Sequence, residues 1–113
     1  MGVITVDEDG EVWSASSRFI HSMLEHFVRT TGEREYLVSF LKSFEHGYNS
    51  IRLNEIDVSR LEEFQKLVQI YINDHEYSAY GDTDADLKAI ERNLQKLIDL
   101  IDLSLTRRRH SII

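Results

Sequence analysis

The last third of the chain has the most regular pattern of apolar and polar positions. Its apolar residues recur every three or four positions, and at roughly 100° per residue such positions share one stripe of a helix. They are Leu87, Ile90, Leu94, Leu97, Ile98, Ile101 and Leu105. Thr83 and neighbouring aspartates precede the stripe, where a helix favours a capping oxygen and negative charge. Arg107 to Arg109 follow it, where a helix favours positive charge. The pattern predicts a helix over residues 84–107, whose stripe other helices must cover.

The same spacing recurs in three earlier stretches and predicts helices over residues 16–31, 33–46 and 57–80. Short connections between consecutive helices favour antiparallel neighbours. The sequence therefore predicts a mainly α fold, a four-helix antiparallel bundle that forms a single helical domain over residues 1–113. Residues 1–13 are expected to form a short β-hairpin appendage to this bundle.

Several residues suit the ends of these helices. Gly32 follows the first helix at the position where a left-handed residue commonly ends one. Thr30 and Glu33 have the spacing of a capping box for the second helix, in which two side chains satisfy the first free N–H groups. Asp57 or Ser59 can cap the third helix with a side-chain oxygen. These residues support the predicted boundaries.

The N-terminal residues have the alternating pattern of strands. Ile4 and Val6 alternate with polar residues, and Asp9-Gly10 follows, a pair typical of a two-residue hairpin turn. That turn would place Glu8 opposite Glu11, an unfavourable pair of like charges, so a longer turn is equally compatible with the sequence.

A hairpin on its own is marginally stable in water and needs further support. It can lie on the helices, add a third strand, for which Ser50 to Leu53 is the only candidate, or pair with another chain. Residues 2–12, GVITVDEDGEV, resemble the opening strands of a PAS sensor domain. The chain lacks the later strands of that fold.

The composition excludes several classes of protein. The absence of Pro, with only five Gly, favours long uninterrupted helices, and the absence of Cys excludes disulfides, zinc–thiolate sites and thiol catalysis. The N-terminus lacks the basic and apolar regions of a signal peptide, and no apolar run is long enough for a membrane span. We therefore expect a cytoplasmic protein without a membrane partner.

Two stretches of the chain carry only acidic charge, within a net charge of −7. Residues 1–13 contain four acids and residues 67–87 contain five, and neither stretch contains Lys or Arg. An acidic field repels phosphates and attracts basic proteins, so a nucleic-acid partner is not expected. Arg107 to Arg109 are interpreted as the charged end of the last helix rather than as a tail for nucleic acid or lipid.

Candidate metal ligands do not form a recognised pattern. The chain has no Glu-x-x-His and no His-x-x-x-His, and His21, Glu25 and His26 lie on the polar side of the first predicted helix. Residues 82–86 imitate the start of a calcium loop but lack its later Gly and Glu, so they are interpreted as a helix N-terminus. His75 is expected on the apolar stripe of the third helix, as a packed or dipole-stabilised histidine. No metal and no cofactor are expected.

Nucleophilic catalysis also lacks a recognisable motif. There is no Gly-x-Ser-x-Gly, no Gly-rich phosphate loop and no Ser in evident register with a His. We therefore expect that the protein is not an enzyme.

The connection between the third and fourth helices is the candidate binding site. Tyrosines there fall off the predicted core stripe among clustered carboxylates, and tyrosines are common in binding hot spots, while acids speed association with a basic partner. The candidate residues are Asp74, Glu76, Tyr77, Tyr80, Asp82, Asp84 and Asp86. The alternative is a solvated connection whose tyrosines pack back on the bundle.

Three functions from different classes follow from these patterns. The first is an acidic module that masks or inhibits a basic protein, for example an immunity-type inhibitor of a nuclease-like toxin. The second is a self-associating structural or regulatory protein, a homodimer with Ile70, Leu100 and Leu103 in its seam, together with Tyr77. The third is a metal-dependent enzyme that uses His21, Glu25 and His75.

Overall fold

The computed structural model describes residues 1–7, 11–32 and 34–111. The chain divides into two compact units, Met1–Ile56 and Asp57–Ile113. The described residues are mainly helical, with four α-helices and one small sheet, which confirms the predicted fold class at that level. That the four helices form one antiparallel bundle, in a single domain, stays a prediction.

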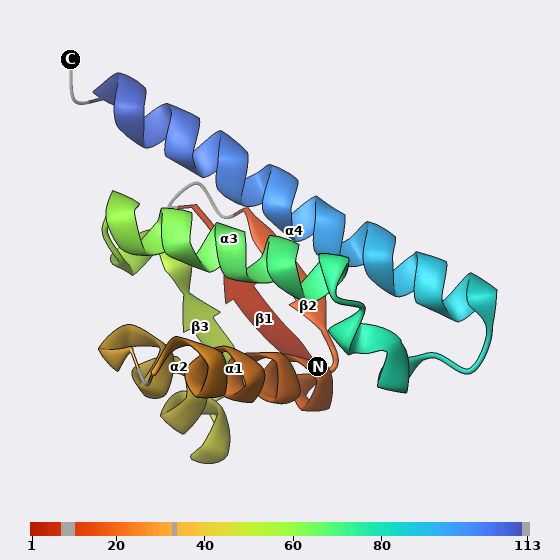
Figure 1. Cartoon of the computed structure of the whole chain (residues 1–113). Helices are drawn as coiled ribbons and strands as arrows, with labels where there is room; N and C mark the ends of the chain where they lie inside the picture. Colours follow the sequence, from red (N-terminus) through yellow and green to blue (C-terminus); the bar gives the residue numbers. More distant parts are fainter. Residues whose placement is uncertain (8–10, 33, 112–113) are drawn as a thin grey trace. The chain divides into compact units, whose positions relative to one another are not determined.

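The first unit contains a three-stranded sheet (Figure 1), whose strands are β1 (Gly2–Thr5), β2 (Val12–Ala15) and β3 (Ser50–Arg52). Their order is β2-β1-β3, with β2 antiparallel and β3 parallel to β1. Ile4 lies between Trp13 and Ile51 in the ladder, and all three are buried on one face of the sheet. Of the three supports predicted for the hairpin, the structure therefore shows the third strand, which comes from the same chain.

The register of the hairpin excludes the two-residue turn. Thr5 pairs with Val12, and the N–H of Val6 donates to the carbonyl of Glu11 over 2.8 Å. A two-residue turn at Asp9-Gly10 would instead place Val6 opposite Trp13. The two-residue turn at Asp9-Gly10 is therefore excluded, and residues 8–10 of the connection lie outside the described residues.

The helices of the first unit are α1 (Ser17–Thr31) and α2 (Glu35–Glu45), which pack against each other and against the sheet. Ser16 caps α1, because its hydroxyl accepts from the N–H of Phe19 over 3.1 Å. Gly32 ends α1 in the left-handed conformation, as predicted.

The predicted capping box of the second helix is wrong. The Thr30 hydroxyl donates to carbonyls of α1 instead, and the N-cap residue of α2 is Arg34, which makes no side-chain capping bond. Glu33 lies outside the described residues. A single-turn 3₁₀ helix, η1 (Leu53–Glu55), follows β3.

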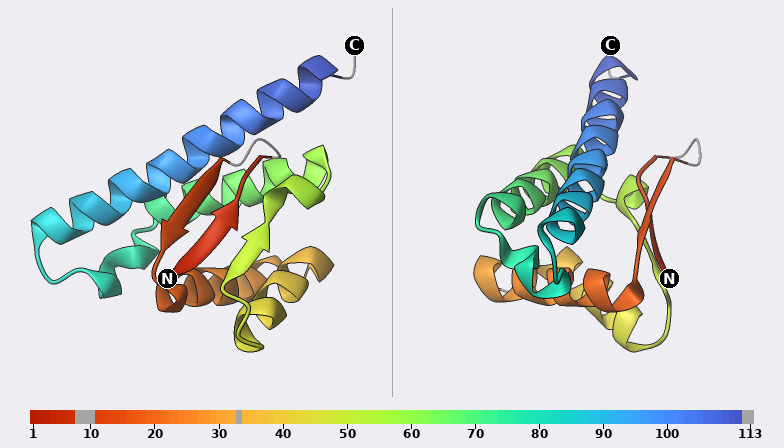
Figure 2. Two further views of the ribbon diagram at one scale, coloured as in Figure 1. Left: turned by 180° about the vertical axis from the view of Figure 1, so that it is seen from behind. Right: turned by 90° about the vertical axis from the view of Figure 1, so that its right-hand side faces the viewer.

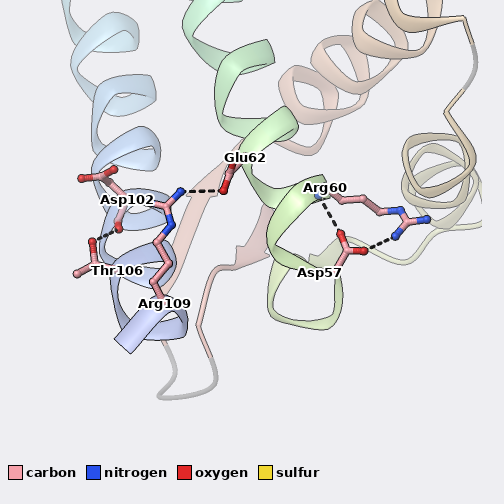
Figure 3. A network of polar contacts seen from close by, with 6 residues as sticks. All are labelled: Asp57, Arg60, Glu62, Asp102, Thr106 and Arg109. Atoms are coloured by element: carbon pink, nitrogen blue, oxygen red, sulfur yellow. Dashed lines mark hydrogen bonds and ion pairs between the residues drawn. The ribbon is translucent and has the colours of Figure 1, made fainter. Parts of the chain in front are cut away.

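The second unit is built on two helices, α3 (Val58–Asn73) and α4 (Asp84–Ser111). They run side by side in opposite directions (Figure 2), and the Gln65 side-chain amide donates to the carbonyl of Ile98 over 3.2 Å. About one turn earlier on α3, a Glu62 carboxylate oxygen contacts the Arg109 guanidinium over 2.7 Å (Figure 3). The apolar stripe predicted for the last helix is buried at Leu94, Leu97, Ile98, Ile101 and Leu105.

The third helix is shorter than predicted. It ends at Asn73, His75 adopts a left-handed conformation with φ 52°, and a separate 3₁₀ helix, η2, spans Glu76–Tyr80. Asn, Asp and His enter the left-handed region more readily than other residues with a side chain, which explains why the helix stops in this polar stretch without a Gly or Pro. The prediction of one helix over 57–80 is therefore wrong at its C-terminal end.

None of the helices in the described part of the chain is both long enough and apolar enough to cross a membrane.

Candidate functional site

The predicted binding residues lie on the connection between α3 and α4, here called the acidic segment and defined as residues 74–86. Its five carboxylate residues are all exposed: Asp74, Glu76, Asp82, Asp84 and Asp86. Two local bonds hold the part next to α4, because the Thr83 hydroxyl accepts from the N–H of Asp86 over 3.1 Å and Asp86 accepts from the N–H of Asp82 over 3.3 Å. This geometry confirms that residues 82–86 form the N-terminus of α4.

Tyr77 does not lie on the exposed surface of the acidic segment. Its side chain is only 2% exposed, so the expectation that it is available to a partner or to a dimer seam is wrong. The left-handed His75 turns the chain after α3, and η2 then brings the ring against α3 and α4. The alternative prediction, a tyrosine that packs back on the helices, is correct for this residue.

The Tyr77 hydroxyl joins a short chain of polar contacts. It donates to a Glu91 carboxylate oxygen of α4 over 3.3 Å, and the Nδ1 atom of His75 lies 3.2 Å from it. Because the hydroxyl proton points to Glu91, Nδ1 of His75 is the donor in the second contact. Burial, and then the charge and hydrogen bond of Glu91, raise the pKa of Tyr77. His75 itself is exposed, so its predicted place on the apolar stripe is wrong.

Tyr80 is the tyrosine of the acidic segment that remains accessible, with 38% of its surface exposed. It belongs to η2 and lies close enough to the buried Tyr71 of α3 to affect it. Burial first, and then the charges of Tyr80 and Glu76, raise the pKa of Tyr71 to about 12. The structure therefore places Tyr80 at the surface of the second unit, with its phenol near the buried Tyr71.

The predicted dimer seam is partly exposed. Ile70 of α3 is 52% exposed and Leu103 of α4 is 53% exposed, whereas Leu100 is half-buried. Large apolar side chains that are more than half exposed are available for contact with a second molecule.

The residues of the metal-enzyme hypothesis do not form a metal centre. The Nε2 atom of His21 lies 3.7 Å from a carboxylate oxygen of Glu45, an ion pair when the histidine is protonated, while Glu25 is exposed. Within the ranges that the structure describes, no three His, Asp or Glu side chains are grouped so that they could hold a metal ion.

The first unit has a surface groove that the sequence did not predict. It has a volume of about 660 Å³ and follows the outer side of α2, where the side chains recur every three or four residues. It is lined by Glu35, Val38, Ser39, Lys42, Ser43, His46 and Tyr48. Most of these residues are polar and belong to no motif in the sequence, so no signal in the sequence marked the groove.

Comparison with protein families, with curated proteins and with solved structures found no match for the chain.

Proposed function

We propose that the protein is a small, acidic, non-enzymatic binding module that masks a basic surface of another protein. The observation that carries the proposal is the acidic segment, which presents five exposed carboxylates and the accessible side chain of Tyr80. Residues 67–87 contain no Lys or Arg, so no neighbouring cation in this stretch neutralises the carboxylates. Clustered acids accelerate association with a basic partner, and a rigid tyrosine supplies contact area.

The specific form of this proposal is an immunity-type inhibitor of a nuclease-like toxin. A protein that binds nucleic acid presents a basic surface to the phosphates, and a carboxylate cluster can occupy the same surface. The small size and the net charge of −7 support this form. It does not require that the four helices form one antiparallel bundle, which remains a separate prediction.

The experiment is affinity capture from the source cell, followed by titration of the captured protein with variants of the acidic segment. We expect Asp84→Lys and Tyr80→Ala each to weaken the complex about tenfold at low salt, because one removes a contact charge and the other an aromatic anchor. Raising the salt should weaken the wild-type complex further.

A matched control makes the same change of charge outside the segment. Glu25→Lys alters an exposed acid of α1 in the first unit and should leave the affinity unchanged. If Glu25→Lys and Asp84→Lys weaken the complex equally, only net charge matters, and the acidic segment is not the binding surface. Unchanged affinity in both Asp84→Lys and Tyr80→Ala would also remove the proposal.

The second candidate function is self-association through the helices of the second unit. The more than half-exposed side chains of Ile70 and Leu103 are the observation that favours it.

A further inference from the structure

The groove of the first unit exists because small side chains lie between larger ones on the outer side of α2. Ser39 and Ser43 are one helical turn apart, and Val38 beside them is half-buried. The larger side chains of Lys42 and Tyr48 also line it. A volume of about 660 Å³ lies within the roughly 300–1,000 Å³ that ligand sites of proteins occupy.

The C-terminal end of α2 places Tyr48 in this groove. Gly47 is left-handed with φ 87°, its N–H donates to the carbonyl of Phe44 over 3.2 Å, and the N–H of Tyr48 donates to the carbonyl of Ser43 over 2.9 Å. These two bonds define a Schellman motif, in which the residue after the glycine usually packs on an apolar side chain one turn back.

In this chain the usual apolar partner of Tyr48 is replaced by a serine. The Ser43 hydroxyl donates to the carbonyl of Ser39 over 3.2 Å and offers no apolar surface. Tyr48 is consequently 69% exposed, and the two backbone bonds fix the main chain from which its ring projects. The local fold therefore exposes an aromatic ring on a fixed backbone, with a serine at the position of its usual apolar partner.

The end of the groove near Tyr48 is cationic. Lys42 and His46 are one turn apart on α2 and both are exposed. Among the described residues, neither side chain has an ion-pair partner. Glu35 lies at the opposite end, in the first turn of α2. A ligand at the Tyr48 end therefore meets positive charge beside an aromatic ring.

We propose that this groove binds an extended peptide segment of another protein, in which a carboxylate residue adjoins an aromatic or aliphatic residue. The carboxylate pairs with Lys42, and with His46 when that imidazole is protonated, while the apolar side chain packs on Tyr48 and Val38. The serine oxygens can accept hydrogen bonds from the peptide N–H groups. The groove suits a peptide because one helix face and one ring form its walls, which leaves the ends open to a continuing chain.

The groove and the acidic segment belong to different units of the chain, and they would bind partners of opposite charge. The acidic segment lies in the second unit and selects a basic partner, whereas the groove selects an acidic peptide. The two proposals therefore fail independently of each other.

The test is a titration of the full chain with synthetic peptides, followed by amide chemical shifts in NMR. The probe is acetyl-Gly-Asp-Phe-Asp-Gly-amide, with one comparison peptide in which Lys replaces both Asp and another in which Ala replaces Phe. We expect saturable shifts at Ser39, Lys42, Ser43 and Tyr48 with the probe, and at least tenfold weaker binding of both comparison peptides.

Protein variants separate the groove from a general charge effect. Tyr48→Ala and Lys42→Glu should each weaken binding of the probe about tenfold, while Tyr48→Phe, which keeps the ring, should bind as the wild type does. Lys66→Glu makes the same charge change at an exposed lysine of α3 and is the control. No saturable shift at the groove, equal binding of the lysine peptide, or equal effects of Lys42→Glu and Lys66→Glu would overturn the proposal.

Discussion

Tyr71 couples the stability of the second unit to alkaline pH. Its pKa in the folded chain is raised from 10.0 to about 12, first by burial and then by the charges of Tyr80 and Glu76. Above pH 10 the unfolded chain therefore loses the phenol proton more readily than the folded chain, so base favours unfolding. The contribution is complete below pH 10 and is lost as the pH rises toward 12.

We expect the free energy of unfolding to fall by about 2 kcal/mol across this interval. Tyr77 contributes in the same direction, because its pKa is also raised. Urea unfolding followed by circular dichroism at several alkaline pH values measures the effect, and Tyr71→Phe should reduce the slope. A slope that is the same in Tyr71→Phe as in the wild type would contradict the assignment to this phenol.

His75 is exposed and Tyr77 is buried, the reverse of the prediction, and both differences have the same physical reason. In a continuous helix, the spacing places His75 on the core side and Tyr77 away from it. Once α3 ends at Asn73, the left-handed turn at His75 resets the direction of the chain, and η2 brings Tyr77 to the core. The polar run Asn73-Asp74-His75 was the available signal, whereas the nearest Gly, at residue 81, indicated a later end.

The start of α3 depends on one of the two caps that the sequence offered. A carboxylate oxygen of Asp57 accepts from the N–H of Arg60 over 2.9 Å, and Ser59 lies inside the helix. The second Asp57 oxygen contacts the Arg60 guanidinium over 2.6 Å (Figure 3), but an exposed ion pair adds little to stability.

We expect Asp57→Ala to lower the free energy of unfolding by about 1 kcal/mol, because the helix loses its capping acceptor. Ser59→Ala is the matched control at an exposed position and should change stability by less than about 0.5 kcal/mol. Thermal and denaturant unfolding of both variants measure this difference. Equal losses in the two variants would show that the cap is not the source of the stability.

At the scale of elements, periodicity predicted the existence and the inward faces of the four helices because burial requires a regular apolar stripe. It did not predict the parallel pairing of β1 with β3, since three residues with one apolar side chain carry little pattern. It also missed the groove on α2, because a polar helix face looks the same in sequence whether it is flat or hollow. A hollow face differs from a flat one here only in the positions of Ser39 and Ser43 relative to Tyr48, which the structure shows.

The candidate binding site was predicted in part. Its carboxylates are exposed, as a run of acids without any Lys or Arg suggests, because isolated charges are costly to bury. The two tyrosines of the candidate site have the same side chain and similar acidic neighbours, yet Tyr77 is buried and Tyr80 is accessible. That difference arises from the turn before η2 and could not be obtained from composition or spacing.

For the whole molecule, charge and exposed apolar residues favour different assemblies. A net charge of −7 opposes the approach of two identical chains at low salt. The exposed side chains of Ile70 and Leu103 favour such an approach once salt screens the repulsion.

The self-association hypothesis therefore predicts that the average mass in light scattering rises with salt and with protein concentration. Leu103→Glu, which places a charge in the seam, should restore the monomer mass, and Thr106→Glu at another exposed position of α4 is the matched control. A monomer mass for the wild type at high salt would exclude the homodimer.

The pairing of β1 with β3 also sets the order in which the first unit can fold during synthesis. β1 leaves the ribosome first, but its second neighbour in the sheet is made only after α1 and α2. Until then one edge of β1 has unsatisfied backbone groups, and such an edge is a template for pairing with other chains. A nascent chain that stalls before Ser50 would therefore be the species of this protein most exposed to aggregation, and the emergence of β3 is the step that ends this vulnerability.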